Sequence, residues 1–164
     1  MAEAAPVAAL PPGWPETWRV VGRRQDTHDT ATLELERLHA APFVFAPGQF
    51  NMIYVPGRGE VAISISGDPA RADRLVHTVR AVGAATRALT GLEPGRELGI
   101  RGPYGRGWPV EAARDRHVVI VAGGIGLAPL RPLIHVLAAR AEERAARGLA
   151  TTLYYGARAP AERI

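Results

Sequence analysis

A glycine-rich stretch at residues 123–130 has the residue types and the spacing of a phosphate-binding turn. It reads Gly-Gly-x-Gly-x-x-Pro and follows the run Val-Val-Ile-Val at residues 118–121. Four β-branched residues in a row predict a strand that is buried on both faces, and the glycines then permit a tight turn. Backbone N–H groups at the start of a helix, unobstructed by side chains, can bind a pyrophosphate, whose charge the helix dipole favours.

An ordinary tight turn of an α/β domain would carry the same glycines, since glycine spacing alone is a weak signal. The neighbouring elements favour the binding role. Pro129 can occupy the first position of a helix and Gly148 can end it. The apolar residues between them recur at helical spacing; they are Leu130, Leu133, Ile134, Leu137 and Ala141. A second strand over 151–155 follows, so the pattern predicts a βαβ unit.

The composition excludes several kinds of function. All 20 basic residues are arginines scattered along the 164-residue chain, and the net charge is only +4. Without a basic stripe and interleaved aromatics, nucleic acid is not an expected partner. The sequence has no cysteine, hence no disulfide, thiolate metal site or iron–sulfur ligand, and its longest apolar run is too short to span a bilayer. We expect a cytoplasmic protein with a disordered Ala/Pro-rich leader at 1–15.

The chain between the leader and the glycine turn alternates like a series of strands. Short apolar–polar runs separated by Gly, Pro and Asp turns predict a short helix at 83–92 and strands at 17–25, 30–38, 49–55, 61–66, 74–82 and 97–101. Six such strands predict a small antiparallel β-barrel of the Greek key type. We place the domain boundary at residue 112, so that the barrel covers 16–112 and the α/β part covers 113–164.

The α/β part contains only one strand–helix unit and one further strand before Ile164. A parallel sheet needs more strands, each covered by helices, and residues 161–164 look like the start of another helix. We therefore expect an incomplete Rossmann-like α/β domain, and a chain that is a fragment or a truncated product of a longer protein.

Several motifs resemble those of the ferredoxin–NADP reductase superfamily. Residues 82–86, Val-Gly-Ala-Ala-Thr, resemble its flavin pyrophosphate motif, and residues 121–130 resemble its pyridine-nucleotide pyrophosphate motif. Two further segments, Pro47-Gly48-Gln49-Phe50 and Gly102-Pro103-Tyr104-Gly105, fall where the superfamily has them. Residues 49–52 and 63–69 are similar to the gamma subunits of cytoplasmic Ni–Fe hydrogenases (sulfhydrogenases), which are related to the electron-transfer subunit of dihydroorotate dehydrogenase.

The resemblance implies an FAD-binding barrel followed by the N-terminal part of an NAD(P)-binding domain. It implies an oxidoreductase that passes hydride between NAD(P)H and FAD, and electrons to or from an iron–sulfur partner such as a hydrogenase subunit of a larger complex. The cysteine cluster of a [2Fe–2S] centre would lie only beyond Ile164, so the fragment alone is expected to be inactive. The superfamily's Arg-x-Tyr-Ser flavin motif is here Val61-Ala62-Ile63-Ser64, which lacks the arginine and the tyrosine.

The resemblance assigns residues of two barrel strands to flavin binding. Ile63 and Ser64 would contact the flavin, and Ser64 would lie beside flavin N5 as the catalytic residue; the alternative for Ser64 is a strand hydroxyl bonded to the backbone. Val79, Arg80 and Ala81 would contact the flavin, and Arg80 could supply the positive charge that is lost at position 61. Alternatively, Arg80 is an ordinary exposed arginine on a strand.

The helix start at Gly83, Ala85 and Thr86 could hold the flavin pyrophosphate through its N–H groups and hydroxyl, or form an ordinary helix cap. The residues expected to bind the pyridine dinucleotide are Gly123, Gly124, Ile125, Gly126, Ala128, Pro129, Gly156 and Arg158. Arg158 follows the second parallel strand, where a dinucleotide-binding domain usually carries an acid. An arginine at that position can bind the 2′-phosphate of NADP, which favours NADP as the dinucleotide. The alternative is that Arg158 is an ordinary surface charge.

No side-chain chemistry competes with this interpretation. The five histidines show no metal-ligand spacing, so we interpret them as non-catalytic, and no nucleophile–base pair stands out. Hydride transfer needs neither, since the cofactors do the chemistry while the protein sets position and electrostatics. The alternative hypothesis is a non-catalytic interaction or regulatory domain that has kept the reductase fold but lost tight flavin binding.

Overall fold

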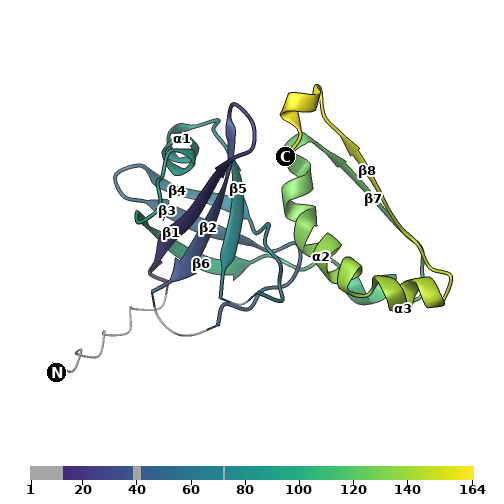
Figure 1. Cartoon of the computed structure of the whole chain (residues 1–164). Coiled ribbons are helices and arrows are strands. Elements are labelled where there is room, and N and C mark those ends of the chain that lie inside the picture. Colours follow the sequence, from purple (N-terminus) through teal and green to yellow (C-terminus); the bar gives the residue numbers. More distant parts are fainter. Residues whose placement is uncertain (1–12, 39–41, 72) are drawn as a thin grey trace.

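The computed structural model describes residues 13–38, 42–71 and 73–164. Residues 1–12 of the expected leader lie outside the described residues. Six strands form one antiparallel sheet, and two further strands form a separate parallel pair (Figure 1). The expected order, a six-stranded antiparallel barrel followed by an α/β part, is therefore confirmed. No helix among the described residues is long and apolar enough to cross a membrane.

The sheet has the order β4-β3-β6-β1-β2-β5. Its strands are β1 (Glu16–Gln25), β2 (Thr30–Arg37), β3 (Phe50–Val55), β4 (Gly59–Ser64), β5 (Leu75–Arg80) and β6 (Glu97–Tyr104). Their alternate residues point inward and bury a core that includes Trp18, Leu33, Leu35, Ile53 and Leu75, as the apolar–polar alternation predicts. The edge strands β4 and β5 approach each other at a bridge between Ile65 and His77, which closes the barrel.

A short helix, α1 (Ala84–Thr90), covers one end of the barrel (Figure 1). Leu89 is fully buried and joins the barrel core, so this helix acts as a plug. It ends at Thr90, with Gly91 as its C-cap, close to the predicted limit of 92. A 3-10 helix (Val110–Ala113) then leads from the barrel to the α/β part.

In the α/β part, β7 (Val118–Gly123) and β8 (Thr151–Gly156) pair in parallel. Between them come a 3-10 segment (Gly124–Leu130), α2 (Arg131–Ala139) and α3 (Ala141–Ala146). The expectation that Pro129 starts the helix was wrong, because Pro129 lies within the 3-10 segment and Pro132 occupies the first turn of α2. The expected start of a helix at 161–164 is a single 3-10 turn (Pro160–Glu162).

The predicted single helix after the glycine turn is also broken, since α2 ends before Arg140. The break lets α3 place Arg144, which is 5% exposed, among loop carbonyls. Its guanidinium donates to the carbonyl oxygens of Ala113, Arg116 and Ala150. These bonds join the helix to the loops that precede β7 and β8, so the break serves the packing of the α/β part.

The prediction that β7 is buried on both faces was wrong. Ile120 is only 4% exposed, whereas Val119 and Val121 on the opposite face are 63% and 72% exposed. Figure 1 shows α2 on one side of the β7–β8 pair, between the pair and the barrel. Because the described elements cover only that face, a β-branched run is half-buried here.

Candidate functional site

A cavity of about 390 Å³ lies where the barrel meets the α/β part. Its size falls within the range of roughly 300–1,000 Å³ that is usual for ligand pockets. The barrel lines it with Thr27, Asp29, Thr30 and Arg80, and the α/β part lines it with Gly123, Gly124, Ile125, Gly156, Ala157, Arg158, Glu162 and Ile164. The structure thus brings Arg80 together with five of the residues expected to bind a dinucleotide.

The main chain of the glycine turn is accessible on the cavity side of the α/β part. A Cβ atom built on Gly124 or Gly126 would meet no heavy atom within 4 Å, so packing does not explain the absence of side chains. Gly124 also has a φ of +49°, which favours glycine. Gly123 pairs with Gly156 at the ends of β7 and β8. Such an open turn leaves room for a ligand to approach the backbone closely.

Arg80 provides a positive charge on the barrel side of the cavity, and a hydrogen bond to Asp29 fixes its side chain. Its Nε donates to Oδ2 of Asp29 over 2.7 Å, and the Asp29 carboxylate also accepts from the hydroxyls of Thr27 and Thr30. The Arg80 hydrogen bond is the main reason that the pKa of Asp29 falls to about 2. Among the described residues the Arg80 side chain makes no other hydrogen bond, so its two terminal nitrogens are available to an anion.

Arg158 lies on the α/β side of the same cavity. Its side chain is 75% exposed and pairs with Glu162, with 3.0 Å between Nη2 and Oε2. Glu162 also faces His28 of the β1–β2 turn, with 3.3 Å between Oε1 and Nδ1. One acid therefore lies between a histidine of the barrel and an arginine of the α/β part.

Thr86 acts as a helix cap, which was one of the two roles open from the sequence. Its Oγ1 accepts from the N–H groups of Val82 and Gly83 and donates to the carbonyl oxygen of Gly83. A hydroxyl has one donor and two acceptor positions, so all three are used. Any contact of this segment with a ligand would have to use main-chain N–H groups such as that of Ala85.

Ser64 ends β4 and is half-buried, and it does not line the cavity. Its carbonyl oxygen accepts a hydrogen bond from Nδ1 of His77 over 2.9 Å. Ile63 packs partly against the barrel core, and Val79 lies within that core at 1% exposure. Of the assigned β5 segment, only Arg80 lines the cavity. In the glycine turn, Ala128 is buried and Pro129 is half-buried, and neither lines it.

His77 was grouped with the other histidines in the sequence interpretation, but its environment differs from theirs. It is fully buried, and Nδ2 of Asn51 donates to its Nε2 over 3.1 Å. Burial lowers its pKa from 6.5 to about 4, so the ring is neutral at physiological pH. The apolar positions flanking it in the β5 alternation were the signal for an inward-facing ring. His39 lies outside the described residues.

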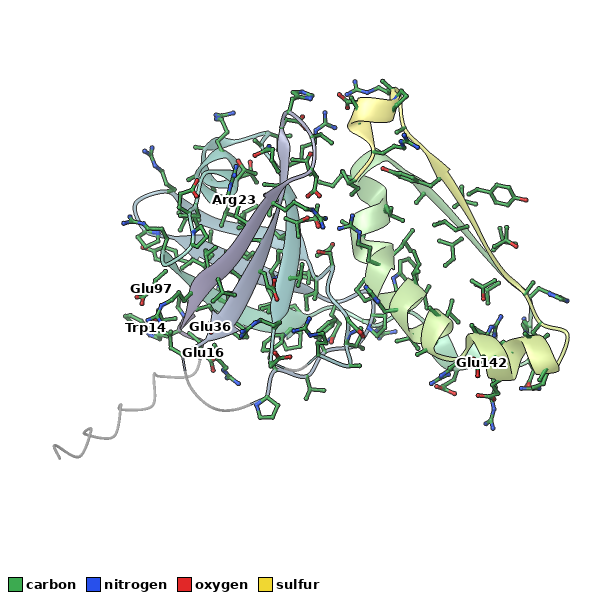
Figure 2. All side chains as sticks on the ribbon, viewed as in Figure 1. Trp14, Glu16, Arg23, Glu36, Glu97 and Glu142 are labelled. Atoms are coloured by element: carbon green, nitrogen blue, oxygen red, sulfur yellow. The ribbon has the colours of Figure 1, made fainter. Side chains whose placement is uncertain are left out.

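Sequence reasoning missed four polar residues of the cavity: Thr27, Asp29, Thr30 and Glu162. The first two were interpreted only as part of a turn. A carboxylate flanked by two threonines in a hairpin was the available signal, since such a group organises hydrogen bonds. Two other acidic residues are remote from the cavity: Figure 2 shows Glu16 and Glu97 on the side of the barrel away from α2, where they pair with Arg37 and Arg19.

No family model matches the sequence. Over 92 residues, or 56% of this chain, it is 38% identical to the sulfhydrogenase 2 subunit gamma of Pyrococcus furiosus, and it covers 32% of that protein. Over 89 residues, or 53% of this chain, it is 43% identical to a probable dihydroorotate dehydrogenase B (NAD(+)) electron transfer subunit of Thermoplasma acidophilum, again covering 32% of it. The chain thus spans about a third of the length of these relatives.

Among solved structures, phthalate dioxygenase reductase has a similar fold, with a TM-score of 0.76 at 24% identity. The match covers 92% of this chain and 46% of the reductase. It includes both the six-stranded barrel and the α/β part, in the same order along the chain. The homologues of this chain are therefore sulfhydrogenase gamma subunits and dihydroorotate dehydrogenase electron-transfer subunits, and its fold is that of the ferredoxin–NADP reductase-type FAD/NAD-binding proteins.

Proposed function

We propose that this chain is an FAD- and NAD(P)-binding module of an electron-transfer oxidoreductase. One observation carries the proposal: a single cavity joins the open glycine turn after β7 to Arg80 of the barrel. The proposed units are an FAD-binding barrel over residues 16–112 and the N-terminal part of an NAD(P)-binding domain over 113–164. The homologues named above support the same kind of function.

The glycine turn would hold the pyrophosphate of the pyridine dinucleotide. Gly124 and Gly126 leave their backbone open, and N–H groups at a helix start suit a phosphate. Gly123, Ile125, Ala128 and Pro129 shape that turn, and Gly156 lies beside it across the parallel pair. Arg158, which is largely exposed, would meet a ribose 2′-phosphate, and this favours NADP over NAD.

The flavin would bind on the barrel between the ends of β4 and β5 and the start of α1. Arg80 supplies a cation with two unused terminal nitrogens, which fits a flavin phosphate and stands in for the arginine absent at Val61. The main chain around Gly83, Ala81 and Ala85 would complete the phosphate contact. Ser64, with Ile63 and Val79 behind it, would lie beside the reacting edge of the flavin ring.

When bound, FAD and NAD(P)H supply the hydride chemistry themselves. The chain's own residues then have three tasks: to hold two phosphate groups, to set the relative position of the two rings, and to exclude water. No general acid or base is required, which fits a cavity whose charged side chains are arginines and carboxylates already paired with one another.

The electron acceptor would be an iron–sulfur partner in a larger complex. Two observations support this: one relative is named as the gamma subunit of a sulfhydrogenase, and another as the electron transfer subunit of a dihydroorotate dehydrogenase. We propose a partner of the same class, such as a hydrogenase-type subunit, for this chain.

A second candidate is an interaction or regulatory domain that has lost tight flavin binding. Two observations favour it. The Thr86 hydroxyl has no hydrogen-bonding capacity left for a ligand, and Arg80 is already paired with Asp29. A flavin must therefore rely on main-chain N–H groups and on the remaining guanidinium nitrogens.

Titration of the purified chain separates the two candidates. FAD is added first and flavin fluorescence is followed; NADPH and NADH are then added, and their own fluorescence is followed. The proposal expects saturable quenching with FAD and saturable binding of the dinucleotide. A folded chain that binds neither would contradict the proposal and support the second candidate.

A further inference from the structure

Arg131 joins the start of α2 to the barrel. Its Nη1 donates to Oγ1 of Thr78 on β5 over 3.1 Å, and the guanidinium is half-buried. Within the part of the chain that the structure describes, only one other polar contact, between His28 and Glu162, connects residues 13–104 to residues 118–164. Arg131 therefore makes one of two polar ties between the two halves of the candidate site.

The hydrogen bonds beyond Thr78 have a fixed direction. Oγ1 of Thr32 lies 2.5 Å from Oδ2 of Asp26, and an ionised carboxylate can only accept. Thr32 thus uses its single proton on Asp26, so across the 2.9 Å contact between Thr32 and Thr78 the donor must be Thr78. Thr78 then accepts from Arg131. The hydroxyl of Ser66, 3.1 Å from Thr78, has one proton, which it can give either to Thr78 or to the carbonyl oxygen of Val76.

The result is a relay from a cation to an anion: Arg131 donates to Thr78, Thr78 to Thr32, and Thr32 to Asp26. Thr78 is 4% exposed, and the Asp26 side chain is equally buried and is also paired with Arg24. Hydrogen bonds in such a chain polarise one another, and those with a charged end are the stronger ones. The start of α2 therefore has one preferred position on the barrel.

The relay lies next to both sides of the candidate site. Arg131 directly follows the glycine turn, and Thr78 is two residues before Arg80 on β5. We propose that Arg131 is a positioning residue: through Thr78 it fixes the glycine turn relative to the flavin-binding face of the barrel. The inference rests on the proposed function, because hydride transfer requires reacting atoms about 3–3.5 Å apart and is sensitive to shifts of about 1 Å.

The tie itself can be tested without ligands. Residual dipolar couplings are measured for amides of the barrel and of residues 118–156 in the parent chain, in Thr78→Val and in Arg131→Met. We expect one alignment tensor to fit the parent and two different tensors to be needed for either variant. Arg140→Met, which removes only an exposed pair with Glu111, should behave like the parent. The proposal would be overturned if a single alignment tensor fitted both parts of the chain in each test variant while the chemical shifts of the barrel amides stayed unchanged.

Because this chain alone is not expected to oxidise NADPH at an enzyme-like rate, the positioning role is tested in single turnovers, in which FAD-loaded protein is rapidly mixed with excess NADPH and the slow reduction of the flavin is followed to its end. Thr78→Val and Arg131→Met should each slow flavin reduction at saturating NADPH at least about tenfold, with the NADPH Kd within about twofold of the parent. Equal losses in Kd and rate would make Arg131 a direct ligand and refute the positioning role. If the parent binds no cofactor, the proposed function fails, whereas the dipolar couplings still decide whether Arg131 fixes the two parts.

Discussion

The imidazole of His77 donates from Nδ1 to the main-chain carbonyl of Ser64 and so links β5 to the end of β4. These are the edge strands of the sheet, and the neighbouring bridge between Ile65 and His77 is where they meet. A buried side chain thus supplies part of the hydrogen bonding that closes the barrel. It does so at the residue proposed to lie beside the flavin.

The His77 ring makes stability depend on pH. Its pKa is about 4 in the folded protein, against 6.5 when exposed, because burial disfavours the charged form. Between these values the unfolded chain binds more protons than the folded one, so stability falls as pH drops from about 6.5 to 4. The loss amounts to a few kcal/mol, at about 1.4 kcal/mol per pKa unit.

Replacing His77 by Phe tests this account by urea unfolding at several pH values. The variant leaves the Ser64 carbonyl and the Asn51 amide without partners, so we expect a loss of roughly 2–4 kcal/mol near pH 7. The difference from the parent should shrink as pH falls toward 4. His135→Gln, at an exposed position on α2, is the control and should leave the pH profile unchanged. A constant difference at all pH values would contradict the assignment.

Gly126→Val should weaken dinucleotide binding without harming the fold. A side chain there would enter open space in the ligand-free protein but would obstruct a pyrophosphate close to the backbone. We expect an unchanged melting temperature, unchanged FAD binding and at least about a tenfold loss of NADPH affinity, or about 1.4 kcal/mol. Equal NADPH affinity in the folded variant would remove the glycine turn from the site.

Gly124→Ala is expected to behave differently from Gly126→Val. The space around it is equally open, but its φ of +49° is strained for any residue with a Cβ. We expect a cost in stability of about 1–2 kcal/mol, measured by urea unfolding. The pair therefore separates backbone strain from obstruction of the ligand.

Arg80→Ala should weaken FAD retention by about 1.5–3 kcal/mol, the scale of a hydrogen bond to a charged group. Asp29→Asn is the matched variant, because it removes the competing anion and keeps the arginine. It should bind FAD at least as well as the parent. Fluorescence titration of both variants decides the role: equal affinity in Arg80→Ala and the parent would make Arg80 a surface residue that only pairs with Asp29.

Local pattern was enough to predict the barrel. Leu33 and Leu35 alternate with glutamates, and glycine and proline mark the turns, so strand limits follow from a period of two. The glycine turn was found in the same way. The exposure of Val119 on one face of β7 was not predicted. A run of β-branched residues indicates a strand, but it does not indicate how many faces of that strand are covered.

The tie between Thr78 and Arg131 could not have been predicted from the sequence. The two residues are 53 positions apart, and an outward threonine on a strand looks the same whether it faces solvent or another element. The Arg80–Asp29 pair could not have been predicted either, because its two residues are 51 positions apart in the sequence. Such contacts depend on how the two parts pack, which no local periodicity encodes.

Gly102 is the position where a single added methyl group should cost the barrel most. A Cβ there would lie 2.1 Å from Oδ1 of Asn51, and the φ of Gly102 is +148°. That oxygen is buried without a hydrogen-bond partner among the described residues, and the same amide holds His77. Asn51 cannot move aside without breaking its bond to the ring, so the clash is not relieved cheaply.

We therefore expect Gly102→Ala to lower the free energy of unfolding by roughly 3 kcal/mol or more, in the range of overpacked buried sites. Gly95→Ala is the control, since Gly95 also has a positive φ but no atom within 4 Å of an added Cβ. It should cost only about 1 kcal/mol of backbone strain. Urea unfolding of both variants at pH 7 gives the comparison. Equal losses would mean that backbone strain, and not the buried Asn51–His77 pair, accounts for the glycine at position 102.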